Sequence, residues 1–169
     1  ARMHFPNGHL ISGNDGEYEQ LWIRTQKLLE QENVIIYEAA FLVDDLFIKT
    51  DILIKKGNHI ELIEVKAKSF LPNDDYLFVG KKNGIKSGWK PYLFDIAFQK
   101  YVINLCFPFW TVKSSIMMAD KSKRASINGL NQLFRISSKG DGRTGVMKKV
   151  NSLQQTGNSI LGRKDITEI

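Results

Sequence analysis

Two runs of aliphatic and β-branched residues, 46–55 and 60–68, stand on either side of a short polar turn. The turn has Gly57-Asn58 at its tip, and such a pair between two apolar runs is typical of a tight β-hairpin. The sequence therefore predicts two adjacent antiparallel strands in the middle of the chain.

The expected register of this hairpin brings charged side chains together. A two-residue loop places residue 54 opposite residue 61, and so places Asp51 opposite Glu64. Side chains alternate along a strand, so Glu64 and Lys66 share a face, and Asp51 is expected to project from that face. Two carboxylates beside a lysine in an apolar hairpin require a compensating cation, which predicts a divalent-metal site.

The rest of the hydrophobic pattern predicts a mixed α/β domain. The expected elements are a helix over 16–31, a strand over 34–42, a helix over 91–105 that starts at a proline, and a strand over 109–118. Residues 69–90 form a long polar insertion that we expect to be a functional or mobile loop. Together these elements predict a central mixed β-sheet flanked by α-helices.

A change in composition suggests where the core ends. We assign residues 1–136 to the core and 137–169 to a polar C-terminal extension, in which we expect loops and at most a weak helix. We interpret this extension as the start of a region in a longer parent protein, whose further domains would be partners of the core.

Composition and charge narrow the function classes. The chain has 169 residues and a net charge of +6, which favours a polyanionic partner such as nucleic acid. Cys106 is its single cysteine, so a disulfide framework, a zinc ribbon and an iron–sulfur cluster are excluded, and a reducing cytosol is the expected location. No run of residues is long and apolar enough to suggest a membrane span.

The hairpin residues suit metal-assisted phosphodiester hydrolysis. Mg²⁺ or Mn²⁺ prefers oxygen ligands, and Asp51, Glu64 and the backbone carbonyl of Val65 offer three of them. Lys66 would hold the attacking water or balance the developing negative charge. The alternative is that Glu64 forms a structural ion pair with Lys66 or with Lys49.

Further polar residues would support this site. Glu38 lies one strand earlier, where a strand-edge glutamate that faces water is the alternative. Glu19 lies early in the first helix, where the preference of the helix dipole for acids is the alternative. Asp95 and Gln99 are four residues apart in the second helix and so lie on one stripe of it. We expect Gln99 to contact the DNA backbone or to orient a metal-bound water, with a plain polar helix face as the alternative.

Two basic groups predict where nucleic acid binds, through its backbone rather than its sequence. The expected contact residues are Lys81, Lys82, Lys86, Trp89 and Lys90 in the insertion and Lys121, Lys123 and Arg124 after the 109–118 strand. Solvated loops are the alternative reading of both groups.

The order Asp51, then Glu64-Val65-Lys66, then a helix with Gln99 resembles the RecB-like branch of the PD-(D/E)xK nuclease superfamily. The chain is most similar to an uncharacterised group of bacterial RecB-like proteins, over roughly residues 5–135. The resemblance implies a restriction-endonuclease-like core, Mg²⁺ or Mn²⁺ dependence, metal-ligand roles for Asp51 and Glu64, and a catalytic role for Lys66.

Two positions depart from the pattern of that branch. The tyrosine expected four residues after Gln99 is Ile103, whereas Tyr101 lies two residues on. The early histidine of many members has no clear counterpart, and Glu19 is the candidate to replace it. The leading hypothesis is therefore a metal-dependent DNA nuclease, and the alternative is an inactive nuclease-like domain that binds nucleic acid or scaffolds a larger protein.

Overall fold

The central feature of the fold is a mixed β-sheet. A computed structural model describes residues 1–14, 16–138 and 144–169. In these residues the elements are η1 (Arg2–His4), β1 (His9–Leu10), α1 (Tyr18–Leu29), β2 (Asn33–Tyr37), β3 (Ala40–Val43), β4 (Leu46–Lys49), β5 (Ile52–Lys56), β6 (His59–Phe70), α2 (Lys90–Cys106), β7 (Thr111–Asp120), η2 (Leu130–Leu133), β8 (Phe134–Ser138), β9 (Thr144–Lys148), η3 (Leu153–Thr156) and β10 (Leu161–Asp165). The expectation of an α/β fold around a mixed sheet is confirmed.

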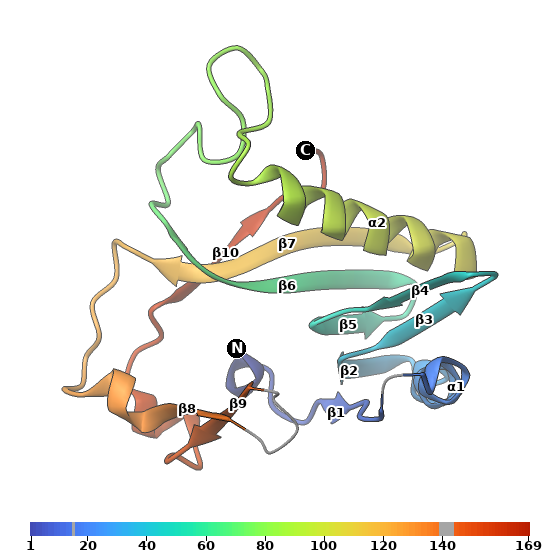
Figure 1. Ribbon diagram of the computed structural model, residues 1–169, viewed down its shortest axis with the longest axis horizontal. Helices are drawn as coiled ribbons and strands as arrows, with labels where there is room; N and C mark the ends of the chain where they lie inside the picture. The colour runs from blue at the N-terminus through green and yellow to red at the C-terminus, as the bar shows by residue number, and fades with distance from the viewer. Residues whose placement is uncertain (15, 139–143) are drawn as a thin grey trace.

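Six of the described strands form the central sheet, in the order β1-β2-β5-β6-β7-β10 (Figure 1). The β1–β2 and β6–β7 pairs are parallel, and the other neighbours are antiparallel. The strands β3 and β4 form a separate two-stranded sheet, and β8 and β9 form another. The helix α2 provides the crossover between the parallel strands β6 and β7, as a parallel connection requires.

The predicted hairpin is present with the predicted register. Lys56 pairs with His59 and Ile54 with Glu61, across a turn in which Gly57 has the positive φ of 57° that a tight hairpin turn needs. The ladder ends at the pair Ile52–Ile63. Asp51 therefore lies in a bend just outside the ladder, at the position that would face Glu64 if the pairing continued by one residue.

The sequence predicted single strands over 34–42 and 46–55, and the structure breaks both of them. The first breaks at Glu38, which has a left-handed φ of 56° and cannot continue the β2 ladder. The second breaks at Thr50–Asp51, and the backbone N–H of Glu38 donates to the carbonyl of Asp51. The two breaks therefore lie side by side, where β3 and β4 leave the central sheet.

Two loop predictions were also wrong. The insertion 69–90 is partly packed, because Leu77 and Phe78 are buried in the main core. Residues 137–169 contain more than loops and a weak helix, because they finish β8 and supply β9 and β10. β10 pairs with β7 in the central sheet, so part of the segment that we assigned to a C-terminal extension completes the sheet edge.

The core divides between the two faces of the sheet. Both helices pack into the larger cluster, which includes Leu21 of α1, Leu53 of β5, Leu62 of β6 and Ile96 of α2. The opposite face carries a smaller cluster of Tyr37, Ile52, Ile63 and Met117. β8 and β9 lie on that opposite side, away from α2 (Figure 1). None of the helices in the described residues is long and apolar enough to cross a membrane.

Thr25 links α1 to the start of β3, next to the break at Glu38. Its hydroxyl is fully buried, donates to the Leu21 carbonyl and accepts from the Ala40 N–H, at 3.0 Å in each case. We expect Thr25→Val to cost about 1–3 kcal/mol in the free energy of unfolding, because it leaves the buried Ala40 N–H without an acceptor. Urea denaturation measures this loss, and Thr25→Ser, which keeps the hydroxyl, serves as the control that should lose less.

Candidate functional site

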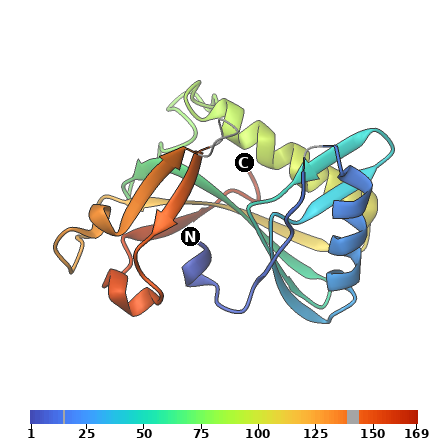
Figure 2. The ribbon, with the colours of Figure 1, turned by 60° about the horizontal axis from the view of Figure 1, so that its bottom comes forward.

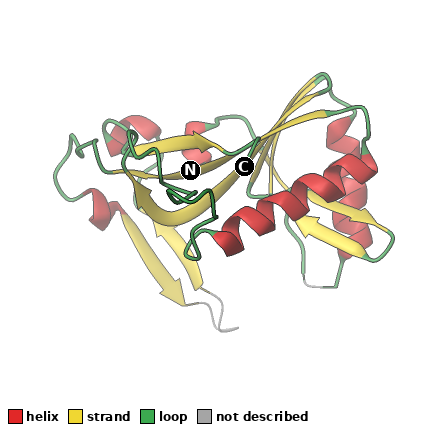
Figure 3. Ribbon diagram, turned by 90° about the horizontal axis from the view of Figure 1, so that it is seen from above, coloured by secondary structure: helices red, strands yellow, loops and turns green. Residues whose placement is uncertain are grey.

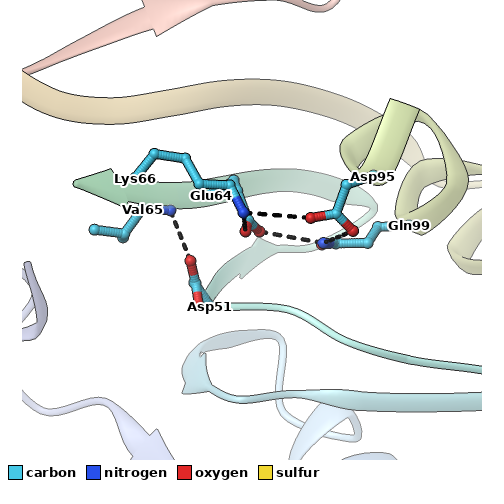
Figure 4. Close-up of polar contacts among 6 residues, drawn as sticks. All are labelled: Asp51, Glu64, Val65, Lys66, Asp95 and Gln99. Atoms are coloured by element: carbon cyan, nitrogen blue, oxygen red, sulfur yellow. Dashed lines mark hydrogen bonds and ion pairs between the residues drawn. The ribbon is translucent and has the colours of Figure 1, made fainter. Parts of the chain in front are cut away.

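Glu64 is the centre of the polar cluster shown in Figure 4. It is buried in the middle of β6, and its side chain lies on the α2 side of the sheet. Its Oε1 accepts from the Nζ of Lys66 at 2.6 Å and its Oε2 accepts from the Nε2 of Gln99 at 3.1 Å. A buried carboxylate without a bound cation needs such partners, and here the strand and the helix each supply one.

Asp51 meets β6 from the neighbouring bend. Its Oδ2 accepts the backbone N–H of Val65 at 2.7 Å (Figure 4). Asp51 therefore contacts β6 through its side chain and not through the backbone pairing with Glu64 that the sequence predicted. The carboxylate thus lies between the start of β5 and the middle of β6, close enough to Glu64 for the two groups to influence each other's pKa.

The surroundings of both carboxyl groups raise their pKa values. Burial raises the pKa of Asp51, the Val65 hydrogen bond opposes this, and the charge of Glu38 raises the pKa further. Burial likewise raises the pKa of Glu64; the hydrogen bond from Lys66 opposes it, and the charge of Asp51 adds to the rise. The net pKa shift is upward for both, so the pair is electrostatically unfavourable when both groups are ionised.

Lys66 is the cation nearest to this pair. Burial lowers the pKa of Lys66. The hydrogen bond and charge of Glu64, and to a smaller extent those of Asp95, raise it, and together they hold the pKa above its ordinary value. The Nζ of Lys66 lies 3.3 Å from the Oδ2 of Asp95 and 5.1 Å from the ring centre of Tyr92. The lysine is therefore fully protonated near neutral pH and held on three sides.

Asp95 and Gln99 come together as their spacing on α2 predicted. The Nε2 of Gln99 donates to the Oδ1 of Asp95 at 3.2 Å as well as to Glu64. Gln99 is buried rather than part of a polar surface, and its Oε1 has no hydrogen-bond partner among the described residues. The amide orientation is fixed because only its N–H₂ side can face two carboxylates.

The two other predicted acids have different places. Glu38 lies close enough to Asp51 to raise its pKa, and it pairs with Arg2 at 2.6 Å and with Lys49 at 3.3 Å. The alternative pairing of Glu64 with Lys49 is therefore not the one formed. Glu19 is exposed on α1, and no hydrogen bond or ion pair within the described part of the chain joins it to the cluster.

The predicted basic groups lie at one end of the sheet. The insertion follows β6 and residues 121–124 follow β7, and the ends of parallel strands meet at the same edge. All of these lysines are exposed, and Lys123 also donates to the Leu161 carbonyl at 2.7 Å. Trp89 is half-buried, with Phe78 at 5.0 Å and the Nζ of Lys68 at 4.7 Å from its ring, so it is packed and not a free stacking surface.

A cleft of about 1310 Å³ borders the site on the face of the sheet opposite α2. Asp51, Ile52 and Val65 lie on the sheet side of it. The other walls come from the N-terminal turn and from residues 125–161 (Figure 2 shows η1 between the β8–β9 hairpin and the strands).

Sequence reasoning missed these walls. The lining residues that it did not anticipate include Arg2, His4, Asn128, Phe134, Lys148 and Asn158. They come from short elements and loops far from Asp51 along the chain, so the sequence carried no signal that would have brought them to Asp51.

No protein-family model, curated protein or solved structure matches this chain. Nor do three or more His, Cys, Asp or Glu side chains gather tightly enough to hold a metal ion within residues 1–14, 16–138 and 144–169. The site is therefore described by its own geometry: a buried carboxyl group on β6, a partly buried one in the bend before β5, a protonated lysine, and an acid and an amide from α2.

Proposed function

We propose that this chain is a metal-dependent nuclease domain that hydrolyses DNA phosphodiester bonds, with a restriction-endonuclease-like core. The observation that carries the proposal is the convergence of Asp51, from the bend before β5, with Glu64 and Lys66 of β6, with the pKa of both carboxyl groups raised. A pair of carboxylates that is costly in the free protein gains most from a divalent cation.

The donor set fits Mg²⁺ or Mn²⁺. These ions bind through one or two carboxylates and complete their shell with water and substrate phosphate. Asp51 and Glu64 would supply the carboxylates, and the backbone carbonyl of Val65 would supply a third oxygen. Asp51 accepts one hydrogen bond, so its carboxylate retains lone pairs for a metal. The bound ion would supply a Lewis acid for the phosphate.

The chain's own residues have separate roles in this proposal. Lys66 would stabilise the negative charge that develops on the phosphate or hold the attacking water. Asp95 is a positioning residue, because it contacts Lys66 and Gln99 but neither Asp51 nor Val65. The exposed lysines at the end of β6 and the basic turn after β7 would contact the DNA backbone near Lys66.

The test is cleavage of DNA by the purified chain with Mn²⁺ or Mg²⁺, and loss of cleavage on chelation. Robust cleavage by Lys66→Ala protein would remove the proposed mechanism. RNA in a parallel reaction decides whether DNA is the substrate.

An inactive nuclease-like domain that binds nucleic acid or scaffolds a larger protein is the second candidate. A specific observation favours it: Glu64 is turned toward α2 with both oxygens already engaged, whereas Asp51 borders the cleft on the other side. Calorimetric titration with Mn²⁺ separates the two, since a binding-only domain need not take up the ion at these residues.

Gln99 gives a finer test of the same site. We expect Gln99→Leu to weaken Mn²⁺ binding about 10–100-fold, because residues that orient a metal's ligands typically contribute that much. Isothermal titration measures the change. Asn104→Leu is the matched control, since it also replaces a side-chain amide by leucine, at an exposed position of α2, and should leave Mn²⁺ affinity as in the unmodified protein.

A further inference from the structure

The outer side of α2 carries a stripe of large apolar side chains. Phe94, Phe98, Tyr101 and Leu105 are 42% to 56% exposed, and Phe109, just beyond the helix, is 89% exposed. No described helix or strand covers this side of α2, as the view from above shows (Figure 3). A contiguous apolar surface of this kind marks an interaction site, because single scattered residues are normal but aligned ones are not.

The stripe has the spacing of a helix–helix seam. Its four helical positions are separated by four, three and four residues, which is the a/d repeat that packs one helix against another. The inner side of α2 is equally apolar, with Leu93, Ile96, Val102 and Ile103 buried against the sheet. A helix that is hydrophobic all round is expected to be buried on both sides.

The charged residues of α2 leave the apolar stripe largely uncharged. α2 contains three charged residues, and two of them are held elsewhere: Asp95 pairs with Lys66, and Lys100 donates to the Thr167 carbonyl. The third, Lys90, lies at the N-terminal end of the helix with its Nζ 5.4 Å from the ring centre of Phe94. Two such surfaces therefore meet without like-charge repulsion along the stripe.

We propose that α2 pairs with α2 of a second copy of this chain, in an antiparallel arrangement about a two-fold axis. The four-three-four spacing reads the same in both directions, so reversal places Phe94 opposite Leu105 and Phe98 opposite Tyr101 of the second copy. This is the self-complementarity that a two-fold interface requires.

Charge complementarity selects the antiparallel arrangement. It places Lys90 of each copy beside the C-terminal end of the other helix, where unpaired carbonyls carry a partial negative charge. It also sets the two helix dipoles antiparallel to each other. A parallel pair would instead bring the two Lys90 side chains together. The proposal does not depend on nuclease activity, because the stripe faces away from Glu64.

The first test is the mass of the full chain in solution, measured by light scattering across a range of protein concentrations. We expect a dimer for the unmodified protein and a monomer, with half that mass, for Phe98→Glu. Ile23→Glu is the matched control, because Ile23 is similarly exposed on α1 but lies outside the stripe, and it should remain a dimer. Circular dichroism melting verifies that both variants fold.

A second test fixes the orientation. Phe98→Cys protein and Tyr101→Cys protein, each also carrying Cys106→Ser and one of them tagged, are mixed and oxidised. The antiparallel pair predicts mainly the mixed disulfide. Cross-linking mainly within each variant would overturn the arrangement. A monomeric unmodified protein, or a dimer that survives Phe98→Glu, would overturn the interface itself.

Discussion

Lys66→Ala is expected to lower kcat for DNA hydrolysis by about 10²–10³-fold, the usual cost of removing one group that stabilises charge in the transition state. The effect should fall on kcat rather than KM, because the exposed lysines of the insertion and of the basic turn would still hold the DNA backbone. Single-turnover cleavage in Mn²⁺ measures the change.

Lys68→Ala is the matched control for this substitution. Lys68 follows Lys66 by two residues on β6, carries the same charge, and lies over the rings of Trp89 and Tyr92 without contacting Glu64. The control should weaken DNA binding at most and leave kcat within a few-fold of the unmodified protein. Equal losses of kcat in the two variants would show that Lys66 only attracts the DNA by its charge and has no role in the chemical step.

Asp51→Asn is expected to make the metal-free protein more stable at neutral pH and to abolish its stabilisation by metal. The folded-state pKa of Asp51 is raised from its ordinary value of 3.8, so the folded protein binds its proton more tightly than the unfolded chain does. Stability from this group is therefore complete below that value and is lost as pH rises through the raised pKa. Asparagine carries no ionisable proton and removes this loss.

Bound Mn²⁺ is expected to make the unmodified protein more stable than the Asp51→Asn protein. Mn²⁺ at a hundred times its dissociation constant should stabilise the unmodified protein by about 2.7 kcal/mol, and should leave Asp51→Asn unchanged. Chemical denaturation between pH 4 and pH 8, with and without Mn²⁺, measures both effects. Asp45→Asn, in the exposed turn between β3 and β4, is the control and should follow the unmodified protein. A metal-free Asp51→Asn protein that is less stable across this range would contradict the electrostatic account.

The sequence was most informative where contacts are local. The hairpin register followed from the position of Gly57-Asn58, because turn length fixes which residues of two connected strands meet. Asp95 and Gln99 converge because residues four apart share one face of a helix. In both cases the spacing along the chain determines the spacing in space.

Other parts of the site depend on contacts that no local pattern encodes. The strand breaks at Glu38 and Asp51 stabilise each other through a backbone hydrogen bond between residues far apart in the sequence, so neither segment alone predicts them. Similarly, Arg2 reaches Glu38 only because the N-terminal turn packs beneath the sheet. The walls of the cleft come from short elements and loops whose positions are set by tertiary packing.

The pairing of β10 with β7 has a practical consequence for how fragments of this protein are designed. A chain shortened to residue 136 would lose the partner of Ser115–Ala119 and expose the main-chain donors and acceptors of β7. An exposed sheet edge of this kind can pair with a strand of another molecule, so the truncated protein would be prone to precipitate. Preparations intended for enzymology should therefore retain at least residues 161–165, even though the segment preceding them has an unremarkable, polar composition.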